Sequence, residues 1–144
     1  DQGQVYTGGG LATYNRVPVP NGDGKIGQVR AVNLDNRTDV WMYRQYAPIT
    51  TSTLPTGGGL VFVGTLDRKL LAFDDTTGKL LWQSPAFTNS IESFPITYSS
   101  GGKQYVAVVT NWSSGLGRLK LLTPDIALPA HNPHEVYVFG LPNK

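Results

Sequence analysis

The chain has 144 residues, enough for one domain with a hydrophobic core, and its 17 glycines and 10 prolines favour many short elements separated by turns. A formal charge of +2, with lysines and arginines scattered along the chain, argues against a nucleic-acid-binding surface. The absence of cysteine excludes disulfides, zinc–thiolate sites and thiol catalysis within these residues, and no apolar stretch approaches the ~20 residues of a membrane-spanning helix.

The first predicted unit occupies approximately residues 1–45. Short apolar runs bounded by turn residues predict strands over residues 4–7, 28–34 and 39–44. We interpret these as the second, third and fourth strands of a four-stranded unit, so that the first strand would precede residue 1.

The second predicted unit, approximately residues 50–85, contains all four strands. They are predicted over residues 51–56, 60–63, 70–74 and 80–84. The runs LVFV and KLLAF are apolar at consecutive positions, which indicates strands buried on both faces.

The third predicted unit, approximately residues 93–144, has strands over residues 95–98, 104–110 and 135–139. A fourth strand would follow the last residue. Both ends of the chain therefore interrupt a unit and leave unpaired strand edges that a folded protein must cover. We expect the chain to be a piece of a larger protein, and the 144 residues alone to self-associate through these edges.

A repeat relates the first two units. The segment GQVRAVNLDNRTDVW aligns with RKLLAFDDTTGKLLW at an offset of 41 residues. The alignment matches three pairs: Ala31 with Ala72, Asn33 with Asp74, and Trp41 with Trp82. A period of about 40 residues with a recurrent tryptophan indicates the four-stranded blades of a β-propeller. The predicted fold is all-β, a partial propeller of about three four-stranded antiparallel blades.

Several recurrent residues have structural interpretations. We expect Trp41 and Trp82, each opposite a small alanine, to dock adjacent blades together rather than to contact a cofactor. Gly78 should supply the positive φ of a tight turn. Asp74 and Asp75 are adjacent on a strand and form a poor acid/base pair, so Asp74 is expected to cap the turn.

The predicted connections divide between the two ends of the blades. Because neighbouring strands are antiparallel, alternate connections lie on the same face. The short turns fall on one face and the long irregular segments on the other: residues 8–26, 46–50, 87–93 and 111–134. Long loops on a rigid scaffold are where binding and chemistry are usually found.

The motifs LPTGGGLVFVGTLDRKLLAFDDTTGKLLW and PITYSSGGKQYVAVV, in this order, resemble the last blades of dehydrogenases that depend on pyrroloquinoline quinone (PQQ). These enzymes oxidise alcohols, methanol or glucose. The similarity is strongest over residues 51–110 and weaker over residues 1–50 and 111–144, where EVYVFGLP resembles the terminal strand of such proteins.

The resemblance implies an eight-bladed periplasmic propeller that binds PQQ with Ca²⁺ or a lanthanide ion. Such an enzyme oxidises an alcohol or sugar and passes electrons to a cytochrome or quinone acceptor. Its metal ligands and catalytic aspartate lie in earlier blades, so the resemblance assigns no catalytic or metal-binding residue to this chain. The segment would be a C-terminal fragment, inactive alone, that packs on the remaining blades and supplies scaffold and one side of the cofactor funnel.

Four residues are candidates for cofactor contact by the resemblance. The loop before TGGGLVF often presents a tryptophan to the quinone, and this chain has Thr50 and Thr51 near that place. The loop after KQYVAV approaches the cofactor in the family, which points to Asn111 and Trp112. A further family position, often asparagine, falls on the glycines at 8–10.

Two alternatives remain open at this point. A propeller of PQQ-like repeats can act as a protein-binding scaffold without enzymatic activity, and a degenerate homologue can keep the fold without the activity. The TGGGLVF and GKQYVAV motifs favour the dehydrogenase, whereas the altered tryptophan and asparagine positions favour the scaffold.

Two further motifs predict no metal site. PNGDGKIG would place Val19 and Arg30 at the first and last positions of a calcium-binding loop, where carboxylates are required. His131 and His134 flank a proline with only Glu135 as a nearby carboxylate, which favours a surface loop.

Overall fold

A computed structural model describes residues 23–111, 120–127 and 134–140 of the chain. This part contains nine strands: β1 (Gly27–Val32), β2 (Asp39–Gln45), β3 (Leu54–Pro55), β4 (Leu60–Gly64), β5 (Leu70–Asp74), β6 (Leu80–Gln83), β7 (Ile96–Ser100), β8 (Lys103–Thr110) and β9 (Glu135–Gly140). They form three antiparallel sheets in the orders β1-β2, β3-β4-β5-β6 and β7-β8-β9. Strands that follow each other in sequence are neighbours in each sheet, as in propeller blades.

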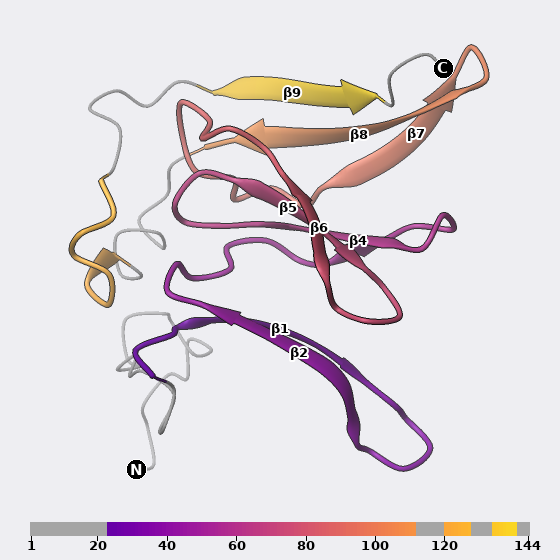
Figure 1. The fold of residues 1–144 in the computed structure, drawn as a ribbon. Helices are drawn as coiled ribbons and strands as arrows, with labels where there is room; N and C mark the ends of the chain where they lie inside the picture. Colours follow the sequence, from indigo (N-terminus) through magenta and orange to yellow (C-terminus); the bar gives the residue numbers. More distant parts are fainter. Residues whose placement is uncertain (1–22, 112–119, 128–133, 141–144) are drawn as a thin grey trace, which may run out of the picture.

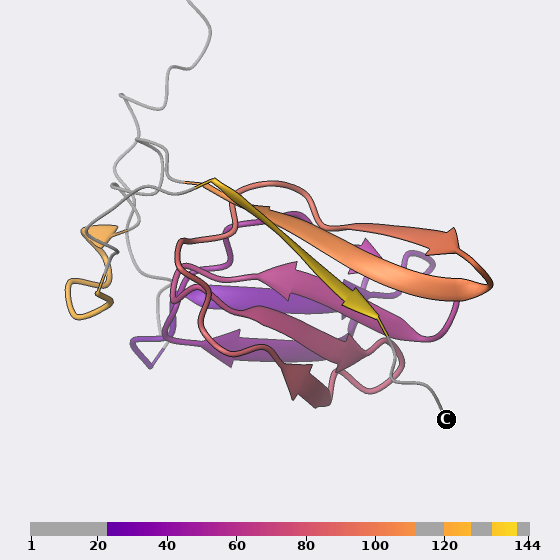
Figure 2. The same cartoon turned by 90° about the horizontal axis from the view of Figure 1, so that it is seen from above.

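The three sheets are stacked in chain order, with the four-stranded sheet in the middle (Figures 1 and 2). This arrangement confirms the predicted all-β fold and the presence of four strands in the second unit, the first of which is shorter than predicted. It also confirms two strands of the first unit and three of the third. The strand predicted over residues 4–7 lies outside the described residues.

The connections between strands separate to opposite ends of the stack, as predicted. The hairpin turns β1–β2, β3–β4, β5–β6 and β7–β8 lie at one end (Figure 1). The connections β2–β3, β4–β5 and β6–β7 lie at the other, which we call the long-loop end. The predicted separation of the connections is therefore confirmed for the parts of the chain that the structure describes.

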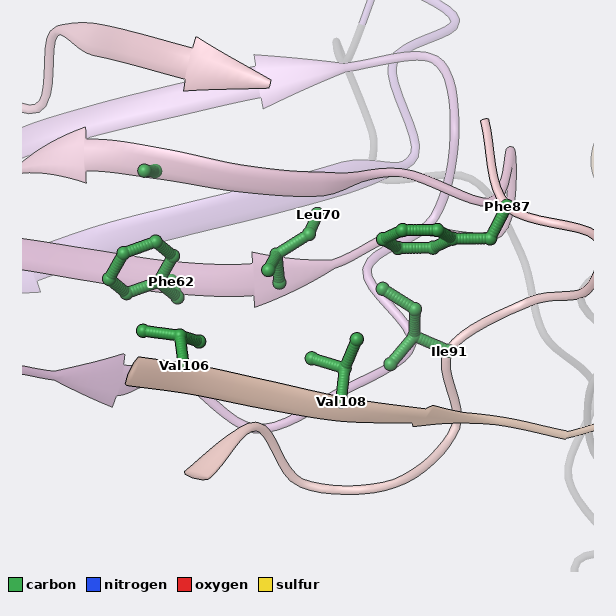
Figure 3. Close-up of a cluster of buried hydrophobic side chains, with 7 residues drawn as sticks. Phe62, Leu70, Phe87, Ile91, Val106 and Val108 are labelled. Atoms are coloured by element: carbon green, nitrogen blue, oxygen red, sulfur yellow. The ribbon is translucent and has the colours of Figure 1, made fainter. Parts of the chain in front are cut away.

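The middle and third sheets bury an apolar cluster between them. Phe62 of β4 and Leu70 of β5 point toward β8, where Val106 and Val108 face them (Figure 3). Burying such side chains supplies the main force that holds two sheets together. β4 and β5 are buried almost throughout, so the expectation that both are covered on two faces is confirmed.

Trp41 fixes the first sheet to the second. Its ring stacks on Phe73 of β5 with ring centroids 6.3 Å apart, and its indole Nε1 donates to the backbone carbonyl oxygen of Asp75 at 2.7 Å. Gly78 lies under this ring: its φ is +69°, and a Cβ atom there would be 2.5 Å from Cδ2 of Trp41. The docking role predicted for Trp41 is confirmed, and Gly78 is needed both for its φ and for the contact.

Matched polar residues cap the two turns that follow β1 and β5. The Oδ1 atom of Asp74 accepts hydrogen bonds from the backbone nitrogens of Thr76 at 3.1 Å and Thr77 at 2.7 Å. Hydrogen bonding from Thr77 lowers the pKa of Asp74. Asn33 occupies the equivalent position, and its Oδ1 accepts from the backbone nitrogen of Asp35 at 2.8 Å. The predicted capping role of Asp74 is therefore confirmed.

Candidate functional site

A bulge at the long-loop end displaces the chain before β3. Ile49 pairs with Thr65 and Leu54 pairs with Phe62. Residues 49 and 54 are five positions apart, whereas their partners, residues 65 and 62, are three positions apart. The chain before β3 therefore contains two extra residues, which bulge out of the ladder. The predicted strand over residues 51–56 is consequently shortened to Leu54–Pro55. Such bulges re-aim side chains next to functional sites.

The hydroxyl groups of Thr50 and Thr51 hold this bulge. The Oγ1 atom of Thr51 accepts from the backbone nitrogen of Gly64 at 2.8 Å and donates to the carbonyl oxygen of Ser52 at 2.7 Å. The Oγ1 atom of Thr50 donates to the carbonyl oxygen of Ile91 at 2.6 Å. The bulge is thus attached to β4 and to the loop that precedes β7.

Gly64 makes this close approach possible. A Cβ atom at Gly64 would lie 2.6 Å from Cγ2 of Thr51 and 2.8 Å from Cβ of Ile91. These separations are well below van der Waals contact, so any larger residue would push the two loops apart.

The loop segment 89–91 links the bulge to Asn111. All three of its residues are fully buried, although they belong to no strand. The Oγ atom of Ser90 donates to the carbonyl oxygen of Leu66 at 3.0 Å, and the backbone nitrogen of Asn111 donates to the carbonyl oxygen of Ser90 at 2.9 Å. Thr50 and Asn111 are therefore linked through neighbouring residues of this segment, at one end of the stack, and Thr51 lies next to Thr50 in the same bulge. Trp112 lies outside the described residues.

The third sheet repeats the same construction. Ile91 pairs with Thr110 and Ile96 pairs with Ala107, which again leaves two extra residues in the loop strand. The Oγ atom of Ser93 accepts from the backbone nitrogen of Val109 at 3.0 Å, as Thr51 does from Gly64. The sequence analysis did not predict these bulges. The repeated pattern of isoleucine followed two residues later by a hydroxyl side chain, Ile49-x-Thr51 and Ile91-x-Ser93, could have indicated them.

Sequence reasoning also missed a cluster of hydrogen-bonded polar side chains around one carboxylate at the same end. Glu135, the first residue of β9, accepts hydrogen bonds from Oγ1 of Thr88 and from the hydroxyl of Tyr137, the latter at 2.6 Å. These bonds, with Thr88 contributing most, lower the pKa of Glu135. The cluster ties the loop before β7 to β9 and keeps a negative charge at this end.

Metal ions require ligand sets of several side chains that lie close together. Over residues 23–111, 120–127 and 134–140, no group of three or more His, Cys, Asp or Glu side chains could hold a metal ion. None of the helical segments in these ranges is long and apolar enough to cross a membrane.

An apolar cavity lies toward the hairpin end, away from the candidate site. Its volume is about 440 Å³, and its walls include Phe62, Trp82, Val106 and Phe139. Trp82 meets Phe139 edge-on, with centroids 5.3 Å apart, and remains 40% exposed. It packs between the sheets as predicted, but less completely than Trp41 does.

The sheet order, the stacking and the long-loop end define this chain as a set of β-propeller blades. Residues 20–106 match the model of the PQQ family, which is described as the glucose/ethanol/alcohol dehydrogenase β-propeller domain. The chain belongs to this family of quinoprotein alcohol and methanol dehydrogenase propellers.

Two characterised relatives and one solved structure illustrate the similarity. The 1-butanol dehydrogenase (cytochrome c) of Thauera butanivorans is 35% identical over 88% of this chain and 18% of its own length. Methanol dehydrogenase (cytochrome c) subunit 1 of Methylobacterium organophilum is 39% identical over 74% of this chain and 17% of its own. A europium-containing methanol dehydrogenase structure superposes with a TM-score of 0.67 at 28% identity, covering 79% of this chain and 23% of that one. The chain thus spans less than a fifth of the length of these two relatives.

Proposed function

We propose that the protein containing this chain is a PQQ-dependent dehydrogenase that oxidises an alcohol or sugar. In this proposal, the chain supplies scaffold and one side of the cofactor funnel. The observation that carries the proposal is that Thr50 and Asn111 both hydrogen-bond to the buried segment 89–91, at the long-loop end of a PQQ-family propeller. The names of the relatives, which are alcohol and methanol dehydrogenases, support the substrate class.

In this proposal the residues at this end form one wall of a quinone site and supply no metal ligand. Thr50, Thr51, Asn111 and Trp112 are the proposed residues around the cofactor. PQQ, when bound, would take up the electrons that the alcohol loses. Ca²⁺ or a lanthanide ion would be held by carboxylates elsewhere in the protein, because the described residues offer no such cluster. The europium in a related methanol dehydrogenase supports the lanthanide option.

The proposed setting of the protein rests on its similarity to the same family. We place this segment at the C-terminal end of a propeller in the periplasm, packed on the remaining blades. A cytochrome c is the proposed electron acceptor, supported by its mention in the names of two relatives.

A protein-binding scaffold is the second candidate function. It is favoured by the threonines at the place where the family often presents a tryptophan, and by the use of both hydroxyl groups in bonds within the chain. A scaffold of this kind would bind no quinone.

Titration of the full-length apo protein with PQQ in the presence of Ca²⁺ separates these functions. We expect saturable, metal-dependent quenching of tryptophan fluorescence, and dye-linked oxidation of 1-butanol or methanol by the loaded protein. Asn111→Ala should weaken PQQ binding, whereas the control Asn36→Ala, in the exposed β1–β2 turn at the hairpin end, should not. A full-length protein that binds no PQQ would overturn the dehydrogenase and leave the scaffold.

A further inference from the structure

We propose that Thr50 and Thr51 are positioning residues: their hydroxyl groups fix the bulge before β3 and thereby set the place of Asn111, instead of donating hydrogen bonds to the quinone. This inference rests on the proposed function, because it concerns how that site is built. The sequence resemblance alone points to both threonines as cofactor contacts, whereas this inference gives their hydroxyl groups a structural role.

The hydroxyl protons of both threonines are already committed. A threonine hydroxyl has one proton to donate. Thr50 donates it to the carbonyl oxygen of Ile91 at 2.6 Å, and Thr51 donates it to the carbonyl oxygen of Ser52 at 2.7 Å. The oxygen of Thr51 also accepts from the backbone nitrogen of Gly64. Turning either hydroxyl toward a ligand would break a bond that holds the loop.

The third sheet provides an internal comparison. Ser93 occupies the position equivalent to Thr51 and accepts from the backbone nitrogen of Val109, which is equivalent to Gly64. The sizes of the paired side chains are also complementary. In the second sheet the larger Thr51 lies against Gly64, and in the third sheet the smaller Ser93, which has no methyl group, is paired with Val109. Because the same hydrogen bond recurs in two blades, we infer that it has a structural role in holding the loop.

The hydrogen bond from Thr50 connects the bulge to the segment that holds Asn111. Ile91 accepts from Thr50, its neighbour Ser90 is anchored to Leu66, and the carbonyl oxygen of Ser90 accepts from the nitrogen of Asn111. The whole path runs through fully buried residues 89–91. A loosened bulge would therefore free the segment that holds the backbone of Asn111 in place.

The test uses the full-length protein with paired substitutions. Thr50→Val and Thr51→Val keep the side-chain shape and remove the hydroxyl, whereas Thr50→Ser and Thr51→Ser keep the hydroxyl. Thr53→Val is the matched control, because Thr53 is an exposed threonine in the same bulge and takes no part in the bonds described above. Hydrogen exchange of residues 87–93 and 111 is measured without cofactor. PQQ affinity and the absorption spectrum of the bound quinone are then measured with Ca²⁺.

We expect the valine variants to exchange faster in both segments, and to bind PQQ on the order of tenfold more weakly with a shifted quinone spectrum. The serine variants and Thr53→Val should behave like the wild type. Weaker binding without faster exchange would indicate direct contact and overturn the inference, as would faster exchange with unchanged binding. If the wild type binds no PQQ, the proposed function fails and the cofactor-positioning role falls with it; the exchange data would then still report whether the threonines hold the loop.

Discussion

Replacing Gly78 with alanine should detach Trp41 from the second sheet. The new Cβ atom would lie 2.5 Å from Cδ2 of Trp41, and the backbone would have to keep a φ of +69°. A positive φ costs a non-glycine residue about 1–2 kcal/mol. Forcing extra volume into a packed contact costs about 1–3 kcal/mol more. The ring can escape only by giving up its hydrogen bond to Asp75 and its stacking on Phe73.

The matched control is Gly102→Ala, in the β7–β8 turn. Gly102 has a φ of +74°, but a Cβ atom there would meet nothing within 4 Å. It should therefore show the backbone cost alone, about 1–2 kcal/mol. The difference between the two variants measures the Trp41 contact.

The assay is hydrogen exchange of β1 and β2 in the full-length protein, together with the midpoint of thermal unfolding. Gly78→Ala should lower the opening free energy of β1 and β2 well beyond the effect of Gly102→Ala. In a Trp41→Ala background, Gly78→Ala should lose this excess cost, because the atoms that it strikes are gone. Equal effects of the two glycine substitutions, or an unchanged excess without Trp41, would refute the docking role derived from the structure.

Three other results follow from the described contacts. Gly64→Ala should lower the thermal midpoint, and adding Thr51→Ser should restore part of it by removing the methyl group at 2.6 Å; no recovery would contradict the packing at Gly64. Because hydrogen bonds from Thr88 and Tyr137 lower the pKa of Glu135, its contribution to stability is present above its unfolded pKa of about 4.3 and is lost as pH falls through the lower folded value. Thermal melts of Glu135→Gln should therefore lack that part of the acid dependence, and an unchanged profile would argue against these bonds. The 144-residue chain alone should self-associate in sedimentation experiments through the exposed valines of β9, and a stable monomer would count against this.

The strands could be predicted because their signal is local. Apolar runs such as LVFV end at turn residues, and a shift of one residue would expose buried side chains, so each pattern has one satisfactory register. The 41-residue offset also identified Asn33 and Asp74 as equivalent, and both do cap their turns.

The strand before the GGG turn was predicted too long because threonine favours strands in general. In ITTSTLP the hydroxyl groups instead bond to nearby backbone atoms, which competes with the ladder. Pro55 has no N–H group to extend the pairing. The bulge thus follows from the hydrogen bonds of the Thr50 and Thr51 side chains, and the average strand propensity of threonine does not include such bonds.

The candidate site could be predicted only in part because its connections are long-range. The family resemblance pointed to Thr50 and Asn111, but Ile91 and Ser90, which join them, come from a third loop. Likewise, the sequence predicted that Trp41 docks blades but could not identify the carbonyl group of Asp75 as its partner. Such contacts depend on how one sheet stacks on the next.

The most direct test of the proposed function is a PQQ titration of the full-length apo protein with Ca²⁺ or a lanthanide ion, followed by a dye-linked alcohol assay on the same sample. We expect stoichiometric binding of PQQ that requires the metal ion, and alcohol-dependent reduction of the dye by the loaded protein. Absence of PQQ binding with either metal ion would contradict the proposed function, and the chain would then belong to a propeller that has kept the family fold for another purpose.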